Sequence, residues 1–167
     1  RGLGDVYKRQ ELVGDYAPEL NVVGAFSGAP PADPLQVLEQ GNDAMLMPVM
    51  GFSANSYSES YPEFREALAE YLTDEGARWL EELRTSCVID VDARPPKHPV
   101  FKGDKTLADI ARGDERIRKY LDLNALGRVK PEAPMLVLTS ADDDIVPSKQ
   151  AEQLAARAGT VYASARR

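Results

Sequence analysis

The stretch MLVLTSADDDIVP, residues 135–147, joins a short apolar run to three adjacent aspartates and a proline. With the two residues before it, the run has the length and composition of a buried strand. Pro147 suits the first turn of a helix, because proline has no N–H to leave unpaired there. The stretch therefore predicts a strand, an acidic turn and a helix, which together form a unit of an α/β sheet.

Segments on both sides of this stretch extend the pattern. Leu20–Ser27 (LNVVGAFS) is predicted to be a second buried strand, and residues 160–163 a brief third one. Helices are predicted at residues 11–16, where a proline follows, and from Pro147 to about Arg157. The alternation of strands and helices at the two ends predicts an α/β fold whose parallel sheet has right-handed crossovers.

Residues 32–127 separate the two predicted parts of the sheet and have helical character. Three segments in this region carry helix signals: Asp33-Pro34, Tyr61-Pro62-Glu63 and Thr106–Leu126. The region is far longer than the dozen or so residues of an ordinary crossover. We therefore predict a large helical cap or lid insertion at residues 32–127, and a core formed by residues 11–31 and 128–167.

Residues 1–10 (RGLGDVYKRQ) are left out of the fold prediction. They have no hydrophobic period and no helix cap. Asp5–Gln10 resembles the translation of GATGTGTATAAGAGACAG, a transposon adapter used to prepare sequencing libraries. We therefore expect an adapter artefact at residues 1–10, with the natural sequence entering at Glu11 inside a longer protein.

Composition and charge exclude several classes of function. The chain is 43% hydrophobic without a long apolar run, which is typical of a globular domain large enough to bury a core. Its 20 basic residues are scattered and its net charge is −7, so we expect no nucleic-acid partner. No segment is long enough to cross a bilayer and no signal peptide is visible.

The three aspartates after the predicted strand of residues 133–140 are the candidates for chemistry. Catalytic groups gather beyond the carboxyl ends of parallel strands. A carboxylate there can accept a hydrogen bond from a histidine of another loop, which fixes the imidazole tautomer and stabilises its charged form. In a second interpretation, one aspartate only caps the next helix in a solvated turn. The residues alone leave both interpretations open.

Two motifs resemble a known family. Ser140–Pro147 is similar to the Gly-x-x-Asp-x-[hydrophobic]-Val-Pro turn that holds the triad acid in α/β-hydrolases. Residues 16–25 (YAPELNVVGA) and 28–33 (GAPPAD) resemble the segment after the nucleophile helix in secretory lipases, which include the fungal lipase A group and bacterial relatives. Similar residues also occur in the caps of those lipases: Tyr61-Pro62-Glu63, Cys87 and Asn124–Gly127.

The resemblance implies part of an α/β-hydrolase fold and a serine-dependent carboxylic ester hydrolase. Its expected substrate is a lipid ester, most of all a triacylglycerol in lipid catabolism, and its expected location is outside the cell. No cofactor or metal is implied, and contact with a lipid interface would be made through the cap. Counting back from Val146-Pro147 makes Asp143 the triad acid. Ser140 stands where the family usually has glycine, which puts the geometry of the turn in question.

The other two members of the triad have no candidate in the chain. Ser53 lies in Gly-Phe-Ser-Ala-Asn, which lacks the second glycine of a nucleophile elbow, and Ser27 runs into prolines rather than a helix. His98 precedes Asp143, whereas this fold has the order serine, acid, histidine. We expect His98 to be an exposed loop residue. The serine and histidine would lie outside residues 11–167, so the chain alone is expected to be inactive.

Two further features have an ordinary and a functional interpretation. Cys87 is the one cysteine, so it cannot form an internal disulfide. The resemblance to exported lipases favours half of a disulfide over a buried free thiol. Methionine and aromatic residues at positions 45–61 are typical of plain packing, although in a lipase cap they would line a tunnel for the acyl chain.

Two other functions compete with the lipase. Asp142-x-Asp144 after an apolar strand is the pattern of a magnesium-dependent phosphatase of the haloacid-dehalogenase type, but Thr139–Ala141 intervenes between strand and carboxylates. Alternatively, Asp33–Leu126 is a non-catalytic helical binding module. That module would fold by itself, whereas a lipase cap without its sheet would expose apolar surface.

Overall fold

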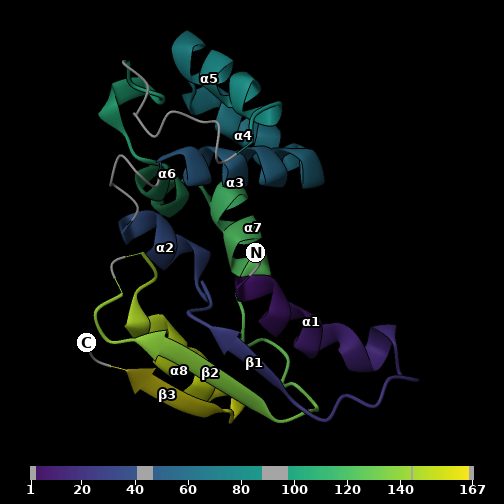
Figure 1. The fold of residues 1–167 in the computed structure, drawn as a ribbon. Helices are drawn as coiled ribbons and strands as arrows, with labels where there is room; N and C mark the ends of the chain where they lie inside the picture. Colours follow the sequence, from purple (N-terminus) through teal and green to yellow (C-terminus); the bar gives the residue numbers. More distant parts are fainter. Residues whose placement is uncertain (1–2, 41–46, 88–97, 144, 166–167) are drawn as a thin grey trace. The chain divides into compact units, whose positions relative to one another are not determined.

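The computed structural model describes residues 3–40, 47–87, 98–143 and 145–165. The chain divides into two compact units. The sheet unit comprises residues 1–37 and 124–167, and the helical unit comprises residues 38–123. Figure 1 shows the three strands gathered in the sheet unit.

The described strands form one parallel sheet, as predicted. The elements of the sheet unit are α1 (Leu3–Tyr16), β1 (Ala25–Gly28), β2 (Met135–Ser140), α8 (Ser148–Ala158) and β3 (Val161–Ala165), with α2 (Pro34–Gln40) starting in it. Strand β2 lies between its two parallel neighbours in the order β1-β2-β3 (Figure 1). The strand, turn and helix expected around the three aspartates are therefore present.

One face of the sheet is covered by helices. The side chains of Val137 in β2, Leu154 in α8 and Tyr7 in α1 are fully buried in one hydrophobic cluster. On the opposite face, Phe26 and Val161 are each 66% exposed. Within the described residues, the strands therefore bury one face rather than two.

Helix α1 begins before the expected start of the natural sequence. It extends from Leu3 and ends at Tyr16, as predicted for its carboxyl end. Residues 3–10, which the prediction left out, thus continue this helix and include the buried Tyr7. Their origin as adapter sequence stays a prediction.

Strand β1 is shorter than predicted. The apolar run suggested a start at Leu20, but the strand begins at Ala25, whose N–H donates to the carbonyl of Pro134 at 3.0 Å. Partner strand β2 starts beside Ala25, so the preceding residues have no neighbouring strand there. Val23 is accordingly 82% exposed.

The helical unit consists of short amphipathic helices. Its elements are α3 (Met47–Ser60), α4 (Pro62–Tyr71), α5 (Asp74–Arg84), a 3-10 turn (Lys102–Asp104), α6 (Leu107–Gly113) and α7 (Glu115–Asn124). Phe64, Ile110 and Ile117 are among its most deeply buried side chains. Val88–Val91, for which an extended segment was predicted, lies outside the described residues.

The amphipathic stretch predicted at Thr106–Leu126 is two helices, α6 and α7, that meet at Asp114. Oδ1 of Asp114 accepts the N–H of Arg116 at 2.9 Å, which caps the start of α7. Oδ2 accepts the Tyr71 hydroxyl at 3.2 Å and Nη2 of Arg116 at 2.7 Å. Both oxygens of this mostly buried carboxylate therefore have hydrogen-bond donors. Asp114 can thus separate the two helices and cap the second of them.

Asp114 makes the stability of the helical unit depend on pH. The pKa of Asp114 lies below its ordinary value, mainly because the guanidinium of Arg116 donates a hydrogen bond to its carboxylate. In the unfolded chain, the pKa of an aspartate is about 4. Because the pKa of Asp114 is lower than this in the folded protein, its contribution to the free energy of unfolding is complete above about pH 4. That contribution is lost as the pH falls through the pKa of the folded state.

We therefore expect Arg116→Leu to unfold more easily than the original chain at neutral pH and above. The difference in unfolding free energy between the two proteins should shrink as the pH falls below about 4. Urea titrations between neutral and acid pH would measure it. A difference that stays constant over this range would show that Arg116 acts through packing alone.

Candidate active site

Asp143 lies in the turn between β2 and α8, three residues after the last residue of the strand. Its Oδ1 accepts two backbone N–H groups, from Ile145 at 3.0 Å and Val146 at 2.8 Å. Val146 is buried and Asp143 itself is half-buried. The carboxylate is thus fixed at the carboxyl edge of a parallel sheet, where catalytic groups gather.

The second oxygen of this carboxylate is available for another donor. Among the described residues, Oδ2 of Asp143 has no hydrogen-bond or ion-pair partner. Asp143 can therefore be both the acid that binds a histidine and the residue that caps the turn, the two interpretations that the sequence left open. Oδ1 holds the turn as a cap does, while Oδ2 can accept an N–H from outside the turn.

Ser140 does not distort the turn. Apart from glycines, the described residues with positive φ are Ala29 and Asp104, so Ser140 has a backbone conformation open to any residue. It pairs with Ala165 at the end of β2. Its Oγ accepts the N–H of Asp142 at 3.3 Å, which supports the first residues of the turn.

The two neighbouring aspartates differ from Asp143. Asp142 is exposed, and its carboxylate has no partner among the described residues. Asp144 lies outside the described residues. Because β2 extends through Ser140, only Ala141 separates the strand from Asp142, so the spacing argument against an Asp-x-Asp phosphatase is weaker than the sequence indicated.

The loop after β1 is tied to the helix after β2. The N–H of Asp33 donates to Oε1 of Gln150, in the first turn of α8, at 2.7 Å. Oδ1 of Asp33 accepts the N–H groups of Leu35 and Gln36 at 3.1 and 3.2 Å, which confirms it as the predicted N-cap of α2. The role of Gln150 could not be predicted from the sequence, because no local pattern distinguishes a buried glutamine in a helix from an exposed one.

Neither serine considered from the sequence lies in a nucleophile elbow. Ser53 lies inside helix α3, where its Oγ donates to the carbonyl of Val49 at 2.9 Å. Ser27 is 1% exposed in the middle of β1, facing the core. An elbow requires a strand-to-helix turn that exposes the hydroxyl.

The single histidine and the single cysteine are both exposed. His98 is an exposed residue outside the helices of the helical unit, as expected for a loop residue. Cys87 is an exposed free thiol after α5. The prediction that Cys87 is half of a disulfide stays open, and the alternative of a buried thiol is wrong.

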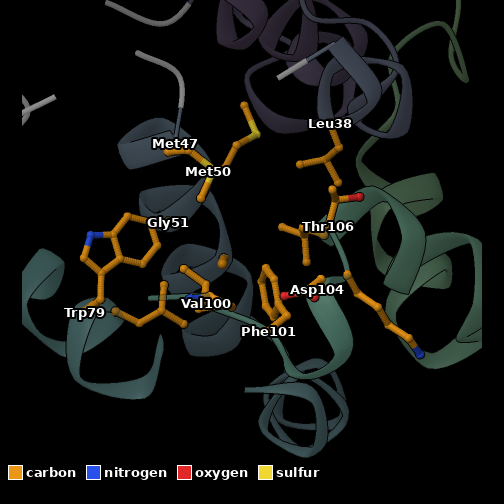
Figure 2. A pocket seen from close by; sticks show the side chains of 14 residues that line it. Leu38, Met47, Met50, Gly51, Trp79, Val100, Phe101, Asp104 and Thr106 are labelled. Carbon is orange, nitrogen blue, oxygen red and sulfur yellow. The ribbon is translucent and has the colours of Figure 1, made fainter. Parts of the chain in front are cut away.

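The helical unit contains an apolar pocket of about 250 Å³. Figure 2 shows Met50, Trp79, Val100 and Phe101 gathered around it. Part of the lining comes from residues 45–61, as the sequence suggested for a lipase cap. The further walls come from residues distant in sequence, so no local pattern could reveal them.

Asp104 and Thr106 are the polar residues beside this apolar wall, together with Lys105. An apolar pocket with a few polar groups at one side suits an amphiphilic or linear apolar ligand. In the described part of the chain, no three metal-ligating side chains cluster, and no helix has the length and hydropathy needed to span a bilayer.

Comparison with known proteins identifies the family. The secretory lipase family model matches residues 8–161. The chain belongs to the secretory lipase family. The matched residues include the turn that contains Asp143.

Several relatives of this chain carry lipase names. Lipase A of Arthroderma benhamiae is 32% identical over 145 residues, and a secreted triacylglycerol lipase of Malassezia globosa is 26% identical over 136 residues. The alignments cover 83% and 79% of the chain, and 30% of each relative. A Mycobacterium tuberculosis protein, 27% identical over 87% of the chain and 32% of its own length, is named a probable inactive lipase. The chain thus spans about a third of the length of these curated relatives.

The fold is that of an α/β-hydrolase. The closed state of Candida antarctica lipase A superposes with a TM-score of 0.79 at 18% identity, covering 96% of this chain and 40% of that one. A second crystal structure of that lipase gives a TM-score of 0.68 at 20% identity. At these identities the similarity establishes the fold, and the chain corresponds to part of it.

Proposed function

We propose that this secretory lipase chain supplies the acid of a Ser-His-Asp triad in a carboxylic ester hydrolase that acts on triacylglycerols. Asp143 is the acid, and the serine and histidine lie outside residues 1–167. The proposal rests on the different environments of the two carboxylate oxygens of Asp143. Oδ1 accepts two backbone N–H groups, whereas Oδ2 has no partner among the described residues.

The division of roles between the two oxygens suits the chemistry. The amides of Ile145 and Val146 hold the carboxylate in one orientation. Oδ2 would accept Nδ1–H of the histidine, which fixes the tautomer whose Nε2 takes the serine proton. The serine would then attack the ester carbonyl, and Asp143 would stabilise the imidazolium that forms. Without the other two groups, residues 1–167 would not turn over esters.

The apolar pocket supports a lipid substrate. Its walls of methionine, tryptophan and phenylalanine are suited to a fatty acyl chain, which has no hydrogen bonds to satisfy. Relatives from Malassezia are named secreted triacylglycerol lipases. We extend the substrate and the extracellular location to this protein as part of the proposal, with the cap as the part that contacts a lipid interface.

The test compares two substrates on the complete gene product. We expect it to hydrolyse a triacylglycerol emulsion without added metal, and to leave a phosphate monoester unchanged with or without Mg²⁺. Residues 1–167 expressed alone should hydrolyse neither substrate. Magnesium-dependent phosphate release would favour the phosphatase alternative. If the complete protein hydrolysed neither substrate and residues 33–126 bound a partner protein, the alternative of a non-catalytic binding module would be favoured.

A further inference from the structure

Gln150 is a fully buried polar side chain in the helix that follows the candidate acid. It lies in the first turn of α8, and its exposed fraction is 0%. Its Oε1 accepts the N–H of Asp33, a residue 117 positions away, at 2.7 Å. Because only an oxygen can accept this N–H, the bond fixes which end of the amide faces the loop after β1.

The two ends of the Gln150 amide differ. Nε2 of Gln150 is buried and has no hydrogen-bond partner among the described residues. An unsatisfied buried donor costs roughly 1–3 kcal/mol, and an apolar side chain would avoid this cost only by leaving the Asp33 N–H without its acceptor. The packing of α8 on the sheet is already provided by Ala151, Leu154 and Ala155. The value of the amide therefore lies in the bond that it makes to Asp33.

That bond joins two loops at the carboxyl edge of the sheet. Asp33 follows β1, and Gln150 follows the turn that contains Asp143. The backbone N–H of Gln150 also donates to the carbonyl of Pro147 at 3.1 Å. Pro147 directly follows Val146, one of the two amide donors to Oδ1 of Asp143. A shift of the first turn of α8 would thus reach the carboxylate of Asp143 through Pro147 and Val146.

We propose that Gln150 is a positioning residue for Asp143. It anchors the first turn of α8 to the loop after β1, and so sets the direction in which Oδ2 of Asp143 faces its histidine. This inference rests on the proposed role of Asp143 as the triad acid.

The test uses Gln150→Met in the complete lipase, with kcat calculated per active site titrated by a phosphonate ester. Methionine keeps the volume but cannot accept the Asp33 N–H. We expect kcat to fall on the order of tenfold, because small misplacements of catalytic groups have effects of this size or larger. KM should change less than twofold. The acid limb of the pH profile should move to lower pH, since a misplaced carboxylate raises the histidine pKa less.

Two further variants separate positioning from stability. Gln150→Glu keeps an oxygen that can accept the Asp33 N–H and should retain most of kcat. Leu154→Val removes a buried methylene from the same helix and should lower stability while leaving kcat per site and the acid limb unchanged. If Gln150→Met yields no titratable enzyme, Gln150→Asn, which is one methylene too short for the bond, should show the same fall in kcat.

Unchanged kcat per site and an unchanged acid limb in Gln150→Met or Gln150→Asn would overturn the inference. Failure of the underlying proposal has a different signature. If Asp143→Asn were fully active in the same assay, the triad assignment would fail regardless of the results at Gln150.

Discussion

Asp143→Asn is expected to lower kcat for ester hydrolysis by about 10³- to 10⁴-fold in the complete protein. The magnitude follows from the loss of the correct histidine tautomer, which has an effect of about 10⁴-fold in serine proteases with the same triad. The fold of the turn should survive the change. The amide oxygen of asparagine can still accept the N–H groups of Ile145 and Val146, in place of Oδ1.

The other end of the asparagine amide accounts for the loss. With its oxygen facing the two backbone donors, the NH₂ group occupies the position of Oδ2. An NH₂ group donates and cannot accept Nδ1–H, so it would stabilise the tautomer with the proton on Nε2. That tautomer cannot take the proton of serine. The measurement is kcat per titrated active site on a triacylglycerol or a chromogenic ester.

Asp142→Asn is the matched control, because Asp142 is adjacent, exposed and unpartnered among the described residues. We expect its kcat to remain within about twofold of the original, as is usual for an exposed residue without partners. A large loss in Asp142→Asn with near-full activity in Asp143→Asn would mean that the wrong carboxylate has been assigned.

Gly76→Ala should have the largest effect on the stability of the helical unit. A Cβ at Gly76 would lie 2.8 Å from the carbonyl carbon of Val100 and closer still to its oxygen. That backbone cannot move freely, because the Val100 carbonyl accepts the N–H of Thr73 at 3.0 Å and Thr73 Oγ1 donates to the carbonyl of Pro99 at 2.8 Å. We expect a loss of about 2–3 kcal/mol of unfolding free energy from overpacking.

Gly113→Ala is the control for this substitution. Gly113 is the last residue of α6, it is exposed, and a Cβ there would meet nothing within 4 Å. Alanine at Gly113 should stabilise the chain by about 0.5–1 kcal/mol, because it lowers the entropy of the unfolded chain. Urea unfolding of both variants and the original chain measures the two effects. Equal stability of the two variants would contradict the close approach at Val100.

The sequence predicts the candidate acid because its turn is local. An apolar run, a group of aspartates and Pro147 lie within thirteen residues, so strand, turn and helix start can be inferred without knowing the rest of the fold. The cap role of Asp33 could be predicted for the same reason. The family resemblance then selects Asp143 among three aspartates that composition and spacing treat alike.

Features that depend on distant residues could not be predicted. The break at Asp114 is supported by the hydroxyl of Tyr71, 43 residues away, and a single amphipathic period continues across it. The start of β1 at Ala25 is set by the partner strand, not by the apolar run that precedes it. The burial of Gln150 likewise depends on a loop 117 residues away.

The most direct measurement is a crystal structure of the complete protein, with the distance from Oδ2 of Asp143 to the nearest imidazole nitrogen. We expect a hydrogen bond of about 2.7–3.0 Å to Nδ1 of a histidine from beyond residue 167. Oδ1 should keep its bonds to the amides of Ile145 and Val146. An Oδ2 that faces only solvent, with the histidine bound by a different carboxylate, would show that Asp143 is not the acid of the triad.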